Sequence, residues 1–111
     1  ASNTVVFKLP PVSLAGVNYK FILDFASDGE NVKDFAIITN ATAENIVGNV
    51  MVAGAILNIT NVSTVQIDTN VGVANYGDWL SVISDGAYWY IDGSTLTASS
   101  IATNAGHSLA T

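Results

Sequence analysis

The stretch GDWLSVISDGAYWYIDG, residues 77–93, decides the fold of this chain. It contains two runs of alternating apolar residues on either side of Asp85-Gly86, a dipeptide favoured in two-residue hairpin turns. Alternation places successive side chains on opposite faces of a strand. The stretch therefore predicts a β-hairpin with strands over 78–84 and 87–92.

A two-residue turn would also fix the register of this hairpin, with Ile83 opposite Tyr88 and Val82 opposite Trp89. One face then consists of aliphatic residues and one Trp, which we interpret as the core face: Leu80, Val82, Trp89 and Ile91. The opposite face is also rich in apolar and aromatic residues: Trp79, Ile83, Tyr88 and Tyr90, with Ser81 among them.

A two-layer sandwich covers only one face of each sheet, so the second face needs an explanation. Tyr and Trp combine an apolar ring with a polar tip, and they are enriched at protein interfaces. We therefore predict that Trp79, Ile83, Tyr88 and Tyr90 form a partner or oligomer interface. Two alternatives stay open: coverage of this face by the same chain, and a platform on which sugar rings stack.

The same two-residue period extends along the chain. In NYKFILDF (18–25), Tyr19, Phe21, Leu23 and Phe25 share one side. Further strands are predicted over 4–10, 34–39, 49–59 (bent at Gly54), 63–69 and 95–101, and a single helical turn over 41–45. About eight short strands separated by turn residues predict an all-β fold, a single-domain antiparallel β-sandwich over residues 1–111. The small, polar residues 102–111 predict a flexible C-terminal arm.

Composition narrows the function. Nine acidic residues oppose three lysines (Lys8, Lys20 and Lys33) with no arginine, for a net charge of −6, which argues against nucleic-acid binding. Only 11% of residues are charged, where about a quarter is ordinary. The longest uncharged stretch, 46–67, is interrupted by asparagines and glycines and predicts strands rather than a membrane span. There is no cysteine and no recognisable signal peptide, so we expect a protein made in the cytoplasm.

Catalytic and metal-binding chemistry finds little support. His107 is the single histidine, and no residue pattern supplies the partners that a catalytic triad requires. Asp24, Asp28, Glu30 and Asp34 bracket a turn, but Ala26 stands where a calcium loop needs a ligand. We interpret these carboxylates as a solvated loop and predict no enzyme, no cofactor and no metal site. The Asn-x-Ser/Thr triplets at Asn40, Asn58 and Asn61 are attributed to composition.

Two stretches carry a resemblance to a known family. GDWLSVISDGAYWYIDG resembles the closing hairpin of tailed-bacteriophage virion proteins, and LPPVSLAGVNYKFIL (9–23) resembles the opening of phage capsid decoration, or cement, proteins. Together they cover about a third of the chain, and residues 26–70 match no family. The hairpin also occurs in phage fibre modules.

The resemblance implies a jelly-roll-like sandwich that forms a homodimer or homotrimer on the outer surface of the virion capsid. There it would bind the major capsid protein and stabilise the shell after synthesis in the bacterial host cytoplasm. The alternative is a carbohydrate- or receptor-binding module of a phage fibre. The two readings differ in what they require of the aromatic face: burial against protein in the first, and exposed coplanar rings at a groove in the second.

Overall fold

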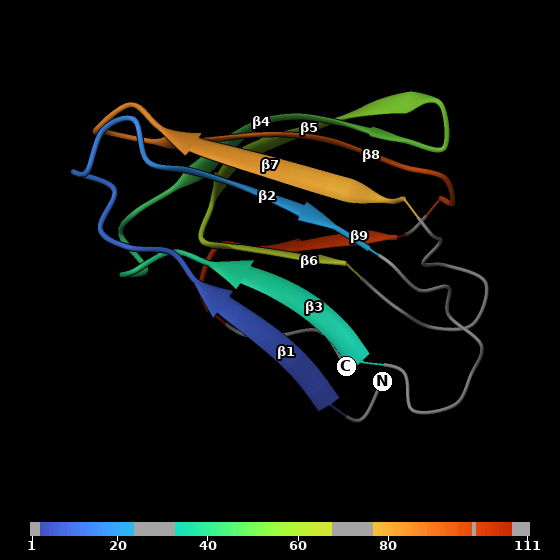
Figure 1. Cartoon of the computed structure of the whole chain (residues 1–111), viewed down its shortest axis with the longest axis horizontal. Helices are drawn as coiled ribbons and strands as arrows, with labels where there is room; N and C mark the ends of the chain where they lie inside the picture. Colours follow the sequence, from blue (N-terminus) through green and yellow to red (C-terminus); the bar gives the residue numbers. More distant parts are fainter. Residues whose placement is uncertain (1–2, 24–32, 68–76, 99, 108–111) are drawn as a thin grey trace.

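Two β-sheets pack face to face in the computed structural model, which describes residues 3–23, 33–67, 77–98 and 100–107 (Figure 1). This part of the chain forms nine strands and no helix. Their bounds are β1 Asn3–Lys8, β2 Asn18–Ile22, β3 Lys33–Ile38, β4 Ile46–Val52, β5 Ala55–Val62, β6 Thr64–Ile67, β7 Trp79–Ser84, β8 Trp89–Thr95 and β9 Ile101–Asn104. The predicted all-β sandwich is confirmed.

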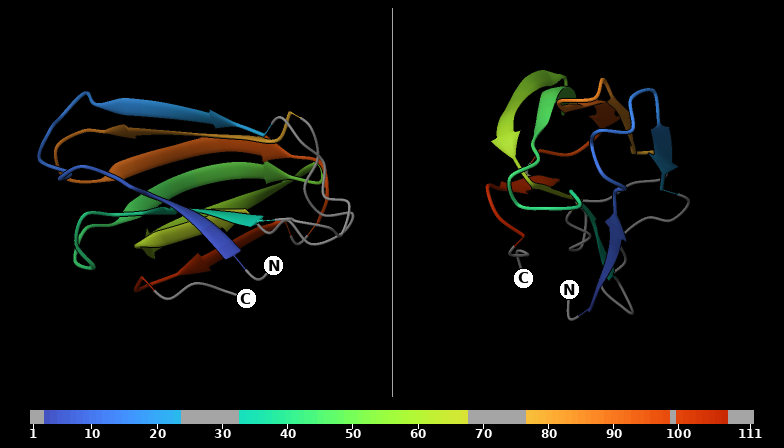
Figure 2. Two further views of the ribbon diagram at one scale, coloured as in Figure 1. Left: turned by 60° about the horizontal axis from the view of Figure 1, so that its bottom comes forward. Right: turned by 90° about the vertical axis from the view of Figure 1, so that its left-hand side faces the viewer.

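One sheet has the order β1-β3-β6-β9 and the other has the order β2-β7-β8-β4-β5. Figure 2 shows these two layers from the side and from one end. Five ladders are antiparallel, as predicted, whereas β1 with β3 and β4 with β8 are parallel. The β1–β3 pair is parallel because the chain crosses to the other sheet as β2 and then returns, which restores its direction.

The core lies between the two sheets and is made of aliphatic side chains around Trp89, which is fully buried. The four residues predicted for the core face of the closing hairpin are all buried there. The remaining members come from both layers: Leu9, Leu23, Ile37, Ile46, Val50, Ile59, Val65 and Ile67. The predicted alternation in β2 also holds, since Asn18, Lys20 and Ile22 are exposed whereas Tyr19 and Phe21 pack against the core.

An aromatic cluster fills the gap between the sheets at β1 and β2. The ring of Phe7 lies 5.0 Å from the rings of both Tyr19 and Phe21, in edge-to-face contacts. Phe35 on β3 lies 5.1 Å from Phe21. Such pairs stabilise a fold by about 0.5–1.5 kcal/mol beyond the burial of their area. The cluster therefore ties the edge strand β1 to the opposite sheet.

The closing hairpin has a different register from the predicted one. Ile83 lies opposite Tyr90 and Ser84 opposite Trp89, a shift of two residues that lengthens the loop to residues 85–88. A type I′ turn needs positive φ at both central residues, but only Gly86 has it, at +99°. Instead, Asp85 Oδ1 accepts the N–H groups of Ala87 and Tyr88 at 2.9 and 2.8 Å. A shift of two keeps every side chain on its predicted face.

The second correction concerns residues 49–59, which form a hairpin of β4 and β5 instead of one bent strand. Val52 lies opposite Ala55, and the two residues between them have φ values of 51° (Ala53) and 82° (Gly54). Positive φ at both central positions is the signature of a type I′ turn. Its sequence, Ala-Gly, lacks the Asn or Asp that usually marks such turns.

The C-terminal segment also differs from prediction. β8 continues through Asp92-Gly93 to Thr95, and β9 begins at Ile101, so the described residues between them, 96–98 and 100, are not in a strand. Residues 102–104, expected in a C-terminal arm, pair with β6, and Thr64 Oγ1 donates to the Gly106 carbonyl at 2.7 Å.

The expected helical turn over 41–45 is a turn without a helix, closed by the bond from Glu44 N to Ala41 O at 3.0 Å.

Trp89→Ala should lower the free energy of unfolding by about 3–5 kcal/mol, because it empties the centre of the core. Trp89→Phe should cost less: it keeps an aromatic ring and removes the indole Nε1–H, which is buried without a partner in this structure. Urea denaturation measures both. Tyr88→Ala, at an exposed ring, is the control with about 0.5 kcal/mol or less. Equal losses for Trp89→Ala and Tyr88→Ala would contradict the core assignment.

Ala53→Asn should raise the melting temperature, since Asn tolerates the left-handed conformation that Ala53 adopts at φ 51°. We expect a gain of about 1 kcal/mol at this exposed turn position. Ala55→Asn, in the strand after the turn, should bring no gain. A fall in melting temperature for Ala53→Asn would show that the turn is not type I′.

Candidate functional site

The outer face of the five-stranded sheet is the most prominent exposed surface of the described residues. Strand pairing places its side chains in three rows across the sheet. The upper row contains Ile22, Trp79, Ser94, Met51 and Ile56. The middle row contains Lys20, Ser81, Asp92, Asn49 and Asn58. The lower row contains Asn18, Ile83, Tyr90 and Val47.

Large apolar side chains in the upper and lower rows are exposed to solvent. Ile56 is 70% exposed and Ile22 is 62% exposed at the two edges of the sheet. Met51, Ile83, Tyr88 and Tyr90 are each exposed by 40–47%. A soluble protein rarely leaves so many large apolar groups on one sheet face unless that face binds something. The three rows therefore define the candidate site, which we call the outer face.

The middle row is polar and holds its side chains in fixed positions. Asn58 Nδ2 donates to Asn49 Oδ1 at 2.8 Å across β4 and β5. The Gly93 N–H donates to Asp92 Oδ1 at 2.8 Å. Lys20 reaches over the upper row, where its Nζ lies 4.6 Å from the centre of the Trp79 ring in a cation–π contact. Lys20 and Asp92 are the charged members of the three rows.

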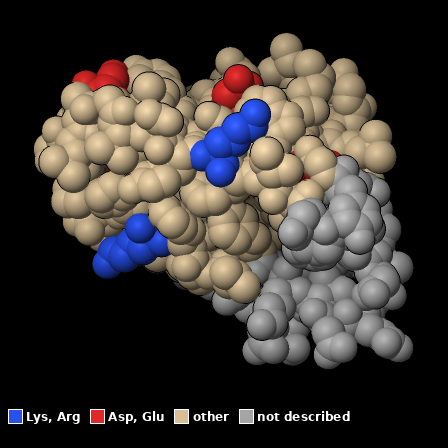
Figure 3. Space-filling model, viewed as in Figure 1, with Lys and Arg blue, Asp and Glu red and all other residues tan. Residues whose placement is uncertain are grey.

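Few charges interrupt the surface elsewhere. Figure 3 shows one side of the molecule, where Lys and acidic side chains form small patches among uncharged residues. This distribution follows from the composition, in which 11% of residues are charged. Contacts made by such a surface depend on apolar burial and hydrogen bonds more than on ion pairs.

The loop of the closing hairpin adds Tyr88 next to Tyr90 of the lower row. The rings of Tyr88 and Tyr90 lie 6.4 Å apart and meet edge to face, at 64°. The N–H groups of Tyr88 and Ala87 and the hydroxyl of Tyr90 donate to Asp85 and hold the pKa of its carboxyl below the ordinary value. The same carboxylate raises the pKa of Tyr90, because its hydrogen bond and negative charge favour the neutral hydroxyl.

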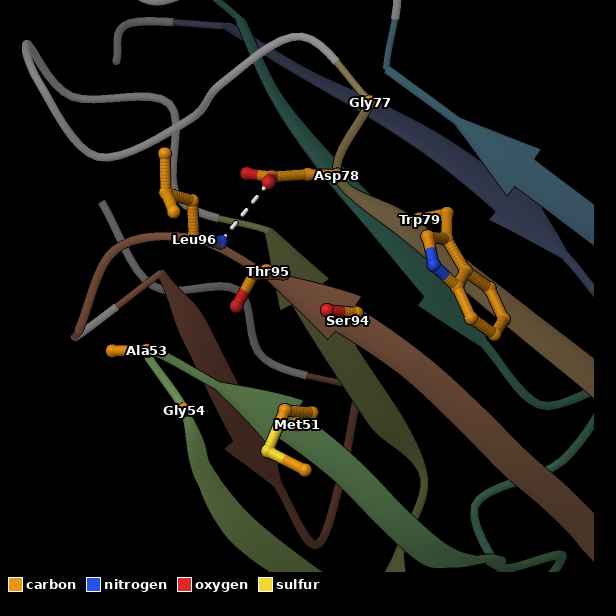
Figure 4. A pocket seen from close by; sticks show the side chains of 9 residues that line it. All are labelled: Met51, Ala53, Gly54, Gly77, Asp78, Trp79, Ser94, Thr95 and Leu96. Carbon is orange, nitrogen blue, oxygen red and sulfur yellow. Dashed lines mark hydrogen bonds between the residues drawn. The ribbon is translucent and has the colours of Figure 1, made fainter.

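A shallow pocket of about 570 Å³ lies beside the central members of the upper row, Trp79, Ser94 and Met51 (Figure 4). Its lining includes Trp79, Ser94, Leu96 and the type I′ turn. The carboxylate of Asp78, which is buried, points at the Leu96 backbone and accepts its N–H at 3.1 Å. No group of three His, Cys, Asp or Glu residues that could hold a metal ion occurs in the described ranges. With Trp79, Ser94 and Met51 in its lining, the pocket extends the outer face.

The structure brings together the four residues predicted for an interface. Trp79 is half-buried under Lys20, and Ile83, Tyr88 and Tyr90 are exposed on the same side of the sheet. Sequence reasoning missed the contribution of β4 and β5, namely Met51, Ile56, Asn49 and Asn58. The alternation on either side of Ala53-Gly54 is compatible with two paired strands, which would have placed these residues on one face. Interpreting 49–59 as a single strand missed this pairing.

The other candidate residues lie away from the outer face or outside the described residues. His107 is half-buried, and its Nε2 lies 3.2 Å from Thr39 Oγ1. Thr39 Oγ1 donates its hydrogen to Ala41 O, so Nε2 must be the donor to Thr39. The carboxylates of the predicted solvated loop lie outside the described residues, namely those of Asp24, Asp28, Glu30 and Asp34. The expectation that this loop binds no calcium therefore stays a prediction. Asn40 is exposed, and Asn61 has a φ of 53° at an irregularity in β5.

Comparisons with protein families, with curated proteins and with solved structures find no match for this chain. No helix in the described ranges has the length and apolar character needed to cross a membrane. Inference about function therefore rests on the geometry and chemistry of the outer face.

Asp85→Asn should lower the pKa of Tyr90 toward its ordinary value of 10.0, because it removes the charge that disfavours the tyrosinate. In the wild type, the Asp85 interactions stabilise the fold above the ordinary carboxyl pKa and are lost as the pH falls through the lowered pKa. The stability that the Tyr90 hydroxyl contributes through Asp85 depends on pH in the opposite direction. It is lost as the pH rises through the raised pKa of Tyr90.

Titration of the Tyr90 ring carbons by NMR measures the effect directly. Asp92→Asn removes the same charge from the neighbouring row and serves as the control. A Tyr90 pKa that responds equally to both variants, or to neither, would contradict the assigned contact with Asp85.

Proposed function

We propose that this chain is a non-enzymatic capsid decoration protein, which binds the outer surface of a shell of major capsid proteins and stabilises it. The observation that carries the proposal is the outer face, where large apolar side chains stand exposed on a rigid sheet. The resemblance of residues 9–23 and 77–93 to phage virion proteins supplies the kind of partner. A protein of this type works as a homo-oligomer on the virion surface.

The surface chemistry supports a protein partner. Interface cores are depleted in charge and enriched in Trp, Tyr and Met, which describes the upper and lower rows. The middle row supplies amides, a hydroxyl and one charge of each sign for hydrogen bonds at fixed positions. Removing this apolar area from water contributes about 25 cal/mol per Å² before the costs of association.

The alternative is a carbohydrate- or receptor-binding module of a phage fibre, which would use Trp79, Tyr88 and Tyr90. Stacking of a sugar ring favours accessible, coplanar aromatic faces. The rings of Tyr88 and Tyr90 stand at 64° to each other, and Lys20 covers one face of Trp79. These two observations give less support to the carbohydrate function than to a protein interface.

A decoration protein stabilises a capsid by bridging neighbouring subunits. Each copy needs only modest affinity, because many bridges together raise the barrier to local opening of the shell. With few charges available, each exposed ion pair would contribute only about 0–1 kcal/mol. Binding through apolar and uncharged polar contacts should therefore resist salt.

The test is co-sedimentation with capsids assembled from the major capsid protein that the same genome encodes. We expect binding to persist at about 1 M salt, where the Debye length is about 3 Å. Decorated capsids should also release DNA at a higher temperature than bare ones. Loss of binding in high salt, or equal melting of bare and decorated capsids, would overturn the proposal.

A matched pair of variants locates the contact. Ile56→Asp places a charge on the outer face and should weaken capsid binding at least about tenfold. Ala43→Asp adds the same charge at an exposed turn residue away from the outer face and should bind as the wild type does. If sugar binding were the function, Tyr88→Ala and Tyr90→Ala would abolish retention on a glycan array while capsids remained unbound.

A further inference from the structure

We propose that a second copy of this chain covers the β2–β7–β8 part of the outer face, through a two-fold axis that runs along β7. The inference deepens the proposed function and rests on it in taking the outer face as the interaction surface. It assigns one occupant to one half of that face, and it leaves the β4–β5 half for the capsid.

The order of charges in the middle row carries the inference. Lys20 on β2, Ser81 on β7 and Asp92 on β8 lie side by side, because Lys20 pairs with Ser81 and Ser81 pairs with Asp92. The row therefore reads positive, neutral, negative across three neighbouring strands. The neutral residue stands midway between the two charges, about 4.8 Å from each neighbouring strand.

A surface with this pattern is complementary to itself. Rotation by 180° about an axis along β7, in the plane of the interface, exchanges the positions of β2 and β8. The strand position of Lys20 then faces Asp92 of the partner subunit, and that of Asp92 faces Lys20 of the partner subunit. Lys20, whose Nζ lies over Trp79 in the single chain, turns toward this carboxylate in the dimer. A two-fold interface makes every such contact twice, so one arrangement produces two ion pairs.

Two other face-to-face two-fold axes through the same strands oppose like charges. An axis perpendicular to the strands, through the middle row, places Lys20 against its own copy and Asp92 against its own copy. An axis along β8 again places Asp92 against itself. Like charges at an interface are costly, so the charge pattern favours the axis along β7 over these two.

The apolar rows fit the same axis. Trp79 and Ile83 both project from β7, so each lies at the axis. Ile83 packs against its own copy, and Trp79 does so once Lys20 has turned from its ring toward Asp92 of the partner subunit. Tyr90 faces Asn18 of the partner subunit, where its hydroxyl end can meet an amide. Trp and Tyr at the centre of an interface, with polar groups around them, are the arrangement found at binding hot spots.

The axis also divides the outer face. β4 and β5 extend beyond the edge of the partner's β2, so Met51 and Ile56 stay accessible in the dimer. Three strands at a spacing of about 4.8 Å make a small interface. We therefore expect a reversible dimer with a dissociation constant on the order of micromolar.

Charge reversal tests the arrangement, with sedimentation equilibrium as the readout. Lys20→Glu and Asp92→Lys should each weaken the dimer at least about tenfold, because each variant opposes like charges twice. The double variant, with both substitutions, should restore dimerisation to within about threefold of wild type. Lys8→Glu makes the same charge change on β1 of the other sheet and should leave the dimer unchanged.

A wild-type protein that stays monomeric, or that forms a trimer, would overturn the inference. So would single variants that dimerise like Lys8→Glu, or a double variant that does not recover. A double variant that dimerises must be folded although it carries both substitutions. Its recovery would therefore show that the single variants lose the dimer through charge and not through misfolding.

Capsid co-sedimentation of the same variants separates the two proposals. An absent dimer with intact capsid binding in the wild type overturns the dimer alone. A charge-dependent dimer with no capsid binding overturns the decoration function alone.

Discussion

Burial of the inner face of the five-stranded sheet against the second sheet is the constraint on which the rest of this structure depends. Trp89, Val82, Ile91 and Leu80 lose nearly all contact with water there. Because strand side chains alternate, fixing these residues inward forces Trp79, Ile83 and Tyr90 outward. Packing of the core thus determines which residues form the outer face. That these residues are apolar does not follow from the core and is a separate feature of the sequence.

The outer face retains its shape because its supports are local and rigid. Asp85 closes the hairpin loop through two backbone bonds, and the Tyr90 hydroxyl joins the same carboxylate. Ser84, which is buried, accepts the Gly86 N–H and donates to the Val12 carbonyl, so the loop is tied to the segment between β1 and β2. Preorganised side chains lose less conformational entropy when a partner binds, which favours association through a small area.

Scarcity of charge gives the few charged residues an unusual influence. On most protein surfaces, many other charged side chains surround a Lys and an Asp two strands apart, so this one pair has little influence on how the surface binds. Here Lys20 and Asp92 are flanked by Ser, Asn and apolar groups, so in the dimer that we propose they set the orientation of the two copies. Apolar burial supplies the affinity in this view, and the charge pair supplies the orientation.

Residue alternation alone is enough to predict the all-β class, the core face of the closing hairpin and the opposite face that carries Trp79, Ile83, Tyr88 and Tyr90. These follow from alternation, which is a local property of the backbone. The register of that hairpin depends also on contacts distant in sequence, because Ser84 at the end of β7 is bonded to Val12, Gly16 and Val17, while Asp85 bonds the loop N–H groups in place of the expected turn. The tertiary structure also turned residues 49–59 into a hairpin, since packing against β8 outweighs the cost of a left-handed Ala53. The row that joins Lys20, Ser81 and Asp92 depends on pairing between strands distant in sequence, and local patterns carry no record of such pairing.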